Sequence, residues 1–240
     1  MNLLAFETST EACSVALWLD GEVRERYELA PRRHAELSLP WAEQLLDEAG
    51  LKRSQLDAIA IGRGPGAFTG VRLAIALAQG IALALDKPIV PVSTLAVLAL
   101  RARAMDVAQT LTQRVFAAID ARMGEVYTAA FELRGDEANL LDTEVVLAPD
   151  AAIVPGEEDD WFGVGTGFAA GDAALRARLS ARFAAVDAEA LPHAADLARL
   201  AAAAYARGEA VAPERVEPAY LRNNVALTIA EQVALRAKSR

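Results

Sequence analysis

The order of predicted strands and helices constrains the fold most, because it occurs twice along the chain. In the first half, short apolar or alternating segments predict strands, and longer periodic segments predict helices. The order is three strands, a helix, a strand, a helix, a strand and a helix, at residues 3–6, 13–19, 23–29, 34–49, 58–61, 71–85, 89–92 and 94–104. Asp20-Gly21, between the second and third strands, is typical of a tight β-hairpin. This order predicts a mixed α/β sheet with flanking helices.

The second half has a similar order without sequence similarity to the first. Its predicted strands and helices are residues 115–119, 125–133, 144–147, 161–164, 172–179, 182–186 and 194–206, and a loop at 149–155 replaces the first helix. Two copies of one order predict two lobes of like topology. The predicted lobes are residues 1–104 plus 207–240, and residues 105–206. The tail segment 225–236 is amphipathic enough to form a further helix.

Composition excludes several classes of protein. Of the 240 residues, 54% are hydrophobic and the net charge is −9, so a sizeable core is expected and direct nucleic-acid binding is disfavoured. The single cysteine excludes a disulfide framework. The first residues do not resemble a signal peptide, and the longest apolar run, Leu73–Leu85, is shorter than the roughly 18 residues that suggest a membrane span. We therefore expect a cytoplasmic protein that does not cross a membrane.

A glycine-rich segment joins the fourth predicted strand to the second predicted helix. Its turn-forming residues are Gly62, Gly64, Pro65, Gly66, Thr69 and Gly70. Backbone N–H groups in such a loop can bind an anion beside a helix N-terminus, so a phosphate site is one interpretation. A dinucleotide fingerprint is a second, but the next strand lacks the acidic residue, and no Walker lysine follows. We favour a third interpretation, a rigid turn that sets the direction of the helix.

Acidic residues end predicted strands at equivalent places in the two halves. Glu7, followed by Thr8, closes the first strand, and Asp120 closes the first strand of the second half. Facing each other across a cleft, these carboxylates would suit a metal–nucleotide complex. Asp, Ser and Thr also accept hydrogen bonds from backbone N–H groups in turns. The residues leave both interpretations open.

Neither histidine has a partner at metal-binding spacing. His34 begins a predicted helix, but position 38, one turn later, is Ser, and His193 likewise has no partner. A catalytic zinc ion needs three protein ligands. We therefore expect no metal site and no cofactor, and we expect His34 to be an exposed residue of the first helical turn.

The predicted helix at 71–85 is apolar on nearly every side. Large side chains form one ridge, and two ridges of small side chains flank it: Ala74, Ala78 and Ala82, and Ala76, Gly80 and Ala84. A helix that is apolar all round must be buried on most sides. The sheet of one lobe covers only one side, so we expect a partner chain to cover another. Small ridges allow a second helix to approach closely.

A series of motifs along the chain resembles, in order, those of the TsaB (YeaZ) family. They are Glu7–Ala16 (D-T-S-T-x-A-x-S-V-A in the family), His34–Pro40 (H-S-x-x-L-x-P), Gly62–Arg72 (G-x-G-P-G-S-F-T-G-L-R), Asp120–Tyr127 (D-A-R-x-x-E-V-Y) and Pro218–Arg222 (P-x-Y-L-R). Glu7 stands where the family has Asp, and Ser38 stands where it has an apolar residue. The motifs cover nearly the whole chain.

The resemblance implies an actin/Hsp70-like (ASKHA) α/β fold made of two RNase H-like lobes. It also implies a non-catalytic subunit in the formation of N6-threonylcarbamoyladenosine beside the tRNA anticodon. TsaB proteins support the transferase TsaD, a paralogue that binds its metal through an H-x-x-x-H pair, and a small ATPase, TsaE, joins them. The resemblance implies that tRNA is reached only through this complex.

The resemblance further implies that the first two helices bind TsaD, and that a homodimer would use the same surface. The residues expected at this interface are His34, Leu37, Trp41, Leu45, Arg72, Leu73, Ile75, Ala78, Gln79 and Ala82. Glu7, Thr8 and Asp120 would then line a vestigial nucleotide cleft. An ATP-binding kinase or ATPase of the same fold is the alternative, and it predicts that a nucleotide binds between Glu7 and Asp120. A metalloprotease-like enzyme lacks its ligands.

Overall fold

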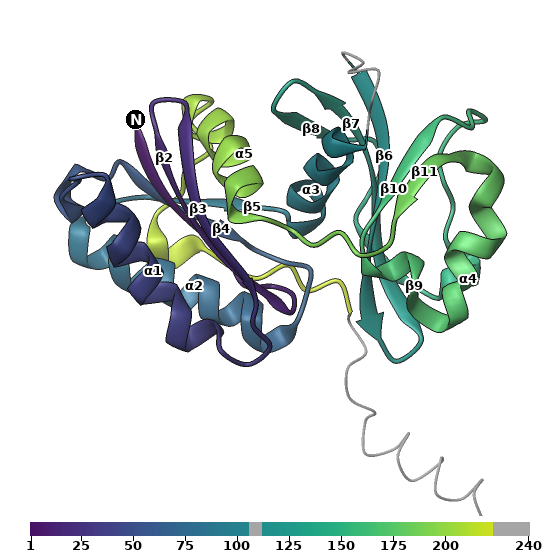
Figure 1. Ribbon diagram of the computed structural model, residues 1–240, viewed down its shortest axis with the longest axis horizontal. Helices are drawn as coiled ribbons and strands as arrows, with labels where there is room; N and C mark the ends of the chain where they lie inside the picture. The colour runs from purple at the N-terminus through teal and green to yellow at the C-terminus, as the bar shows by residue number, and fades with distance from the viewer. Residues whose placement is uncertain (106–111, 223–240) are drawn as a thin grey trace, which may run out of the picture.

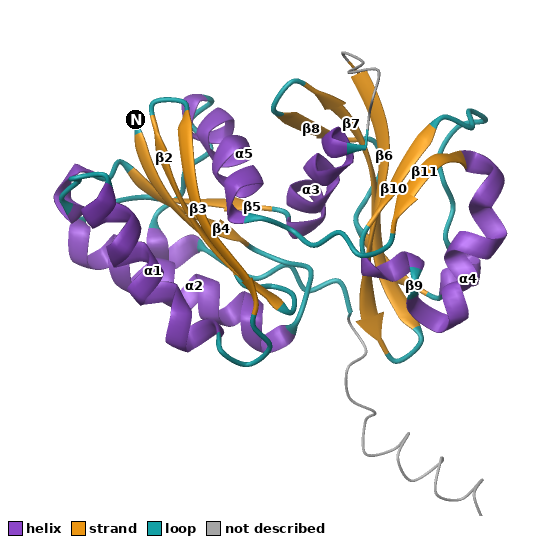
Figure 2. Ribbon diagram, in the orientation of Figure 1, coloured by secondary structure: helices purple, strands orange, loops and turns teal. Residues whose placement is uncertain are grey.

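A computed structural model describes residues 1–105 and 112–222 of the chain. Two β-sheets form two lobes, and helices flank both sheets (Figure 1, Figure 2). The predicted mixed α/β class with two sheets is therefore confirmed. The tail helix predicted at 225–236 lies outside the described residues.

The first sheet has five strands in the order β3-β2-β1-β4-β5. The strands are β1 (Asn2–Glu7), β2 (Ala12–Leu19), β3 (Glu22–Leu29), β4 (Ala58–Gly62) and β5 (Ile89–Val92). β1 pairs antiparallel with β2 and parallel with β4. Asp20 and Gly21 have φ values of 46° and 105°, so this pair forms the tight hairpin that its sequence predicts.

Alternate side chains of β1 enter two different cores. Leu4 and Phe6 pack beneath α1 (His34–Glu48) and α2 (Phe68–Leu85). Leu3 and Ala5 point to the opposite side, where α5 (Ala194–Ala206) packs. Figure 1 shows α1 and α2 side by side on one face of the sheet and α5 on the other. The sheet is therefore buried on both faces, which explains why four consecutive residues of β1, Leu3 to Phe6, are apolar.

The second sheet has the strand order β11-β10-β6-β7-β8, and β9 pairs with β7 off this path. The strands are β6 (Thr112–Arg122), β7 (Glu125–Arg134), β8 (Glu137–Leu140), β9 (Val145–Leu147), β10 (Trp161–Val164) and β11 (Phe183–Asp187). α3 (Thr94–Ala99) packs against β6 and β7, and α4 (Ala170–Leu179) lies near β7. The third strand predicted at 144–147 is β9, so the sequence prediction missed β8.

The helices α3 and α5 lie between the two sheets (Figure 1). α5 packs mainly on β1 and β2, although the predicted boundaries placed residues 194–206 in the second lobe. α3 packs on β6 and β7, although it was predicted in the first lobe. These two helices thus cross the predicted boundaries, because α3 packs on the sheet that follows it in the chain, whereas α5 packs on the first sheet, which lies far before it in the sequence. The division into independent units stays a prediction.

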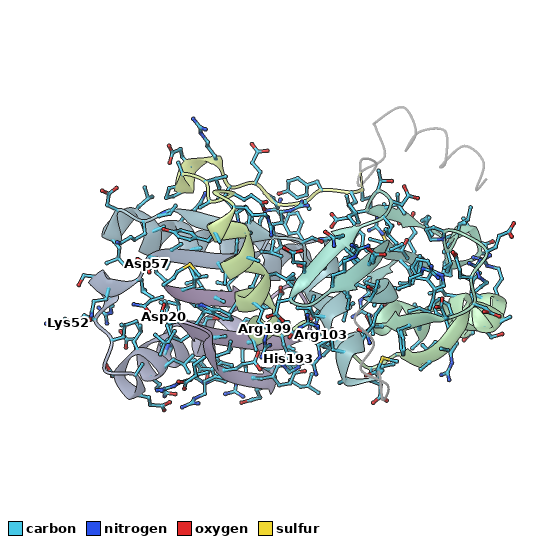
Figure 3. All side chains as sticks on the ribbon, turned by 90° about the horizontal axis from the view of Figure 1, so that it is seen from above. Asp20, Lys52, Asp57, Arg103, His193 and Arg199 are labelled. Carbon is cyan, nitrogen blue, oxygen red and sulfur yellow. The ribbon has the colours of Figure 1, made fainter. Side chains whose placement is uncertain are left out.

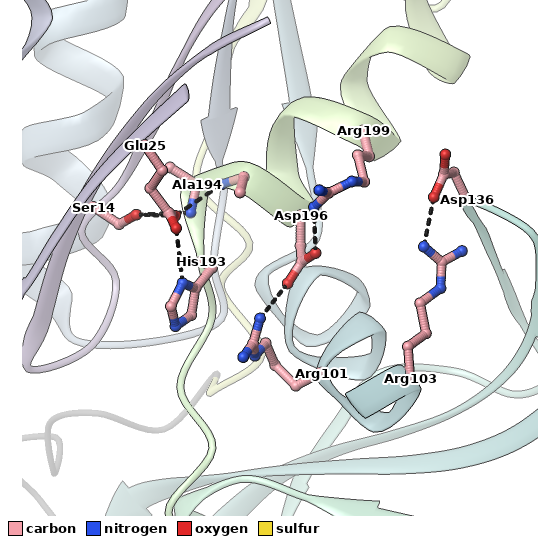
Figure 4. A network of polar contacts seen from close by, with 10 residues as sticks. Ser14, Glu25, Arg101, Arg103, Asp136, His193, Ala194, Asp196 and Arg199 are labelled. Atoms are coloured by element: carbon pink, nitrogen blue, oxygen red, sulfur yellow. Dashed lines mark hydrogen bonds and ion pairs between the residues drawn. The ribbon is translucent and has the colours of Figure 1, made fainter. Parts of the chain in front are cut away.

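Polar contacts fix the start of α5 at this junction (Figure 4). Glu25 of β3 lies 3.0 Å from Nδ1 of His193, the residue before the helix. Asp196, in the first turn, is buried and pairs with Arg101 of the segment after α3 at 3.1 Å. Seen from above, His193 and Arg103 lie near the middle of the molecule, between the lobes (Figure 3). The junction is therefore held by ionic contacts as well as by apolar packing.

Two helix boundaries differ from the sequence prediction. α2 begins at Phe68 rather than at residue 71, so it includes the last part of the glycine-rich segment. The helix predicted at 94–104 is α-helical to Ala99 and continues as a 3-10 helix from Leu100 to Ala104.

Candidate functional site

The glycine-rich segment packs directly against the turn that follows β1. A Cβ on Gly66 would lie 2.4 Å from the carbonyl oxygen of Ser9, and a Cβ on Gly70 would lie 1.9 Å from that of Thr8. Gly64 has a φ of +94°, in the region that favours glycine. Glycine at these positions therefore lets two backbone segments approach closely, which is a structural requirement independent of any ligand.

Several backbone groups of the glycine-rich segment are already bonded within the protein. The N–H of Ala67 donates to the carbonyl oxygen of Ser9 at 2.7 Å. The N–H of Gly64 donates to Oγ1 of Thr94 at 3.2 Å, and its carbonyl oxygen accepts from the N–H of Thr94 at 2.9 Å. An anion would have to displace these bonds. They favour the rigid turn over the phosphate site, with Gly62 ending β4, Pro65 buried, and Thr69 exposed in the first turn of α2.

Glu7 is buried beneath the glycine-rich segment and is only 1% exposed. Its Oε1 accepts hydrogen bonds from the N–H of Ser9, at 2.8 Å, and from the Ser9 hydroxyl. Its Oε2 has no hydrogen-bond partner in residues 1–105 and 112–222. Burial raises the pKa of Glu7 to about 6, and the hydrogen bonds from Ser9 only partly oppose this. The neighbouring Thr8 is fully buried, and its hydroxyl donates to the carbonyl oxygen of Gly70 at 2.8 Å.

Asp120 holds its own turn in the second lobe. One carboxylate oxygen accepts from the N–H of Arg122 at 2.7 Å, and the other pairs with the Arg122 guanidinium at 2.8 Å. The N–H of Asp120 donates to Oγ1 of Thr166 at 3.1 Å. The hydrogen bonds of Asp120 and Glu7 thus support the turn-forming interpretation of both residues. The nucleotide interpretation gains no comparable contact in the described part of the chain.

His34 is half-buried rather than exposed, so that prediction was wrong. Its Nε2 lies 3.0 Å from the carbonyl oxygen of Thr10 and 3.1 Å from that of Ala12. Because carbonyl oxygens only accept, Nε2 must carry the proton. These hydrogen bonds therefore connect the start of α1 to the turn between β1 and β2. No group of three or more His, Cys, Asp or Glu side chains suited to a metal ion occurs among the described residues.

The outward side of α2 is apolar and open. Phe68 and Leu83 are each 67% exposed. Ala76, Gly80 and Ala84 are also exposed, and a Cβ on Gly80 would meet nothing within 4 Å. On the adjacent α1, Leu39 is 45% exposed. We call this surface of α1 and α2 the docking face. It is formed by Leu39, Phe68, Leu73, Ala76, Leu77, Gly80, Leu83 and Ala84, with Leu37 and Trp41 partly exposed beside it.

Several residues predicted at a partner interface lie inside this lobe instead. Leu45, Ala78 and Ala82 are fully buried, and Ile75 is 7% exposed, all in the core between the helices and the sheet. The ridge of Ala74, Ala78 and Ala82 therefore packs on the protein's own sheet. The other small ridge, Ala76–Gly80–Ala84, faces outward. The sequence prediction placed Ala78 and Ala82 at the partner interface, but the small ridge open to solvent is the other one.

An arginine at the start of α2 lies over two aromatic rings. The guanidinium carbon of Arg72 is 3.2 Å from the centre of the Phe68 ring and 5.1 Å from that of Tyr220. Arg72 was predicted from the sequence as an interface residue but the two rings were not, although Tyr220 lies in the motif Pro218–Arg222. Tyr220 is 56% exposed. Arginine and aromatic residues are enriched among the residues that dominate binding energy at protein interfaces.

The segment that carries Tyr220 runs from α2 to the second lobe. Gln79 of α2 donates to the carbonyl oxygen of Pro213 at 2.9 Å, so Gln79 serves an internal contact. The N–H of Ala219 donates to the carbonyl oxygen of Arg63 at 2.9 Å. Arg222 then donates to the carbonyl oxygen of Ala121 at 3.1 Å and pairs with Glu125. Residues 213–222 therefore link the docking face, the glycine-rich segment and the second sheet.

By length and composition α2 is also able to cross a membrane. Its mean hydropathy is 1.7 over 18 residues, of which 28% are buried, and it is the one such helix in the described residues. The sequence estimate fell short because the helix starts at Phe68. Ala74, Ala78 and Ala82 pack on the sheet of the same lobe, which lipid could not replace without exposing that sheet.

The fold and these contacts define a two-lobed mixed α/β protein, with an apolar helix face on its first lobe. The model of the family TsaD, tRNA N6-adenosine threonylcarbamoyltransferase, matches residues 27–230. The tRNA threonylcarbamoyladenosine biosynthesis protein TsaB of Escherichia coli K12 is 44% identical over 94% of this chain and 96% of that protein. The chain belongs to the TsaB family.

Other relatives agree with this assignment. The TsaB protein of Haemophilus influenzae is 40% identical over 94% of this chain and 95% of its own. The solved structure of YeaZ from Pseudomonas aeruginosa has 49% identity and a TM-score of 0.81, covering 92% of this chain and 99% of that one. By contrast, the tRNA N6-adenosine threonylcarbamoyltransferase of Magnetococcus marinus is 45% identical over only 33% of this chain and 24% of that protein. The similarity to this full-length transferase is thus confined to part of each chain.

Proposed function

We propose that this chain is a non-catalytic subunit in the formation of threonylcarbamoyladenosine in tRNA, and that it acts by docking on TsaD. Membership of the TsaB family supports a role in this process, because relatives that match over nearly their full length are named for tRNA threonylcarbamoyladenosine biosynthesis. The observation that carries the docking role is the outward side of α2, where Phe68, Gly80 and Leu83 leave an apolar surface open to solvent. Exposed apolar surface of this kind marks an interaction site.

The burial and pairing of the residues predicted to line a nucleotide cleft support the proposed absence of catalysis. Glu7 and Thr8 are buried under the glycine-rich segment, and Asp120 is paired with Arg122. We further propose that TsaE joins the complex, that tRNA reaches this chain only through it, that a homodimer would use the same docking face, and that the complex is cytoplasmic. The net charge of −9 supports indirect contact with tRNA.

Depletion of the protein, followed by mass spectrometry of bulk tRNA, tests the process. We expect loss of the modified adenosine and its return with the wild-type gene, but not with Gly80→Glu, which places a carboxylate on the docking face. Unchanged tRNA modification after depletion would refute the proposal. Turnover of ATP by the pure protein, abolished by Asp120→Asn, would instead favour the kinase or ATPase alternative.

A further inference from the structure

The charges of the docking face are divided unequally between its two helices. α1 carries the carboxylates Glu36, Glu43, Asp47 and Glu48, and from His34 to Glu48 it has no Lys or Arg. α2 carries no carboxylate from Phe68 to Leu85, and Arg72 is its one charged residue. A partner therefore meets a neutral apolar strip on α2 beside an acidic strip on α1.

The acidic residues lie on the outward side of α1. Glu36, Glu43 and Asp47 are exposed, and their spacing of seven and four residues places them on one side of a helix with 3.6 residues per turn. Leu39 lies on the same side and is 45% exposed. The carboxylates thus border the apolar surface that a partner would cover. We call Glu36, Glu43 and Asp47 the acidic ridge.

Basic residues of the same chain neutralise this ridge only in part. Glu43 pairs with Arg53. Glu36 lies 3.4 Å from Arg33, but Arg33 is closer to Glu28, at 2.6 Å, so two carboxylates share one guanidinium. Asp47 has no ion pair in residues 1–105 and 112–222. The ridge therefore keeps a net negative charge when the partner arrives.

We propose that the acidic ridge selects a partner whose docking helix carries basic residues beside an apolar surface, and that it disfavours a second copy of this chain. A second copy brings the same ridge and the same net charge of −9, so its approach is opposed by like charge. A basic partner is attracted instead. Like-charge repulsion of this kind gives specificity between partners that bury similar apolar surfaces. The proposal rests on the docking role proposed above and names the chemistry of the surface that fits it.

Salt separates the two associations, because it screens attraction and repulsion alike. The experiment measures self-association by analytical ultracentrifugation and affinity for purified cognate TsaD by calorimetry, at about 0.05 M and about 0.5 M NaCl. We expect affinity for TsaD to fall by about tenfold with added salt, while self-association strengthens. Loss of salt dependence for TsaD, or self-association that stays constant or weakens with salt, would overturn the proposal.

Charge reversal localises the effect. The variant Glu43→Lys/Asp47→Lys should lower affinity for TsaD by about tenfold at low salt and should not weaken self-association. The matched control is Glu157→Lys/Asp159→Lys, because both side chains are exposed in the second lobe and the change in net charge is the same. This control should change each association by less than about twofold. Equal effects of both variants would overturn the proposal in favour of net charge alone.

The result is distinguishable from failure of the docking role itself. If Gly80→Glu leaves affinity for TsaD intact, the docking face is wrong, and the acidic ridge loses its role with it. If Gly80→Glu abolishes binding while Glu43→Lys/Asp47→Lys does not weaken it, the docking face stands and only the charge selection is refuted.

Discussion

The guanidinium of Arg72 lies over the ring of Phe68, 3.2 Å from its centre, and also lies 5.1 Å from the centre of the Tyr220 ring. Phe68 begins α2 and Tyr220 belongs to the segment at 213–222, so the stack joins parts of the chain that are far apart in sequence. Both rings remain more than half exposed. The stack therefore presents rigid aromatic surface at one end of the docking face.

Replacing Phe68 or Tyr220 by Ala should weaken binding of TsaD much more than it weakens the fold. An exposed cation–π contact stabilises a protein by only about 0.5–1 kcal/mol, whereas a buried aromatic anchor in an interface contributes about 2 kcal/mol or more. Calorimetric affinity and thermal melting measure the two effects. Ile153→Ala is the control, since Ile153 is 78% exposed and lies in the second lobe. If Ile153→Ala lowers the affinity for TsaD as much as Phe68→Ala or Tyr220→Ala does, the aromatic stack is not part of the interface.

The two small ridges of α2 should respond oppositely to a carboxylate. Gly80→Glu should leave the melting temperature close to that of the wild type, because the site is open, yet prevent co-purification with TsaD. Ala78→Glu should unfold the first lobe, because it buries an unpaired charge at a cost of several kcal/mol, on the order of 3–5. A folded Ala78→Glu protein that fails to bind TsaD, beside a Gly80→Glu protein that binds, would show that the ridge containing Ala78, and not the one containing Gly80, meets the partner.

Two glycines of α2 provide a matched pair of substitutions. Gly70→Ala should destabilise the fold by about 1–3 kcal/mol, because the new Cβ meets the carbonyl oxygen of Thr8. Gly80→Ala should stabilise it by about 0.5–1 kcal/mol, because the site is open and alanine favours the helix. Chemical denaturation measures both. Similar effects of the two changes would argue against a packing role for the glycine-rich segment.

Glu7 should make stability fall as the pH rises. Its pKa is raised from the usual 4.5 to about 6 in the folded protein, so the folded state holds the proton more tightly than the unfolded state. Stability is unaffected below the unfolded pKa and is lost as the pH rises through the folded pKa. The loss is complete above the folded pKa and amounts to about 2 kcal/mol.

Glu7→Gln removes this titration. We expect the variant to be more stable than the wild type by about 2 kcal/mol near neutral pH, with the difference vanishing below the unfolded pKa. Denaturation curves across this range measure it. Glu11→Gln, at an exposed carboxylate of the same turn, controls for the loss of one negative charge. A difference that does not change with pH would contradict the burial of a titrating carboxylate.

The sequence predicted the elements but not the rotation of α2 about its axis. Both small ridges have the same spacing and consist of small residues, so the periodicity of the helix does not decide which one faces the sheet. That choice is made by tertiary packing, which sets Ala78 against the core and leaves Gly80 in solvent. Periodicity therefore predicted that a partner is needed and misplaced the residues that would meet it.

Contacts between distant segments account for the other omissions. β8 is short and partly polar, and it is a strand because it pairs with the end of β7. Tyr220 meets Arg72 only after the chain has returned from the second lobe. The predicted turn chemistry at Asp120 is supported, because an Asp that accepts from the N–H two residues later is a local pattern. The sequence therefore predicted hydrogen bonds within a turn, whereas it did not predict contacts between segments that are far apart in the chain.

The position of α5 on the first sheet has a consequence for synthesis of the chain. Leu3 and Ala5 are translated first, but the helix that covers them follows the whole second sheet. One apolar face of the first sheet stays uncovered until α5 has left the ribosome. Nascent chains that stop before residue 194 would present this face to other chains and to chaperones. The protein is therefore expected to complete its first lobe last, and truncated products should aggregate rather than fold.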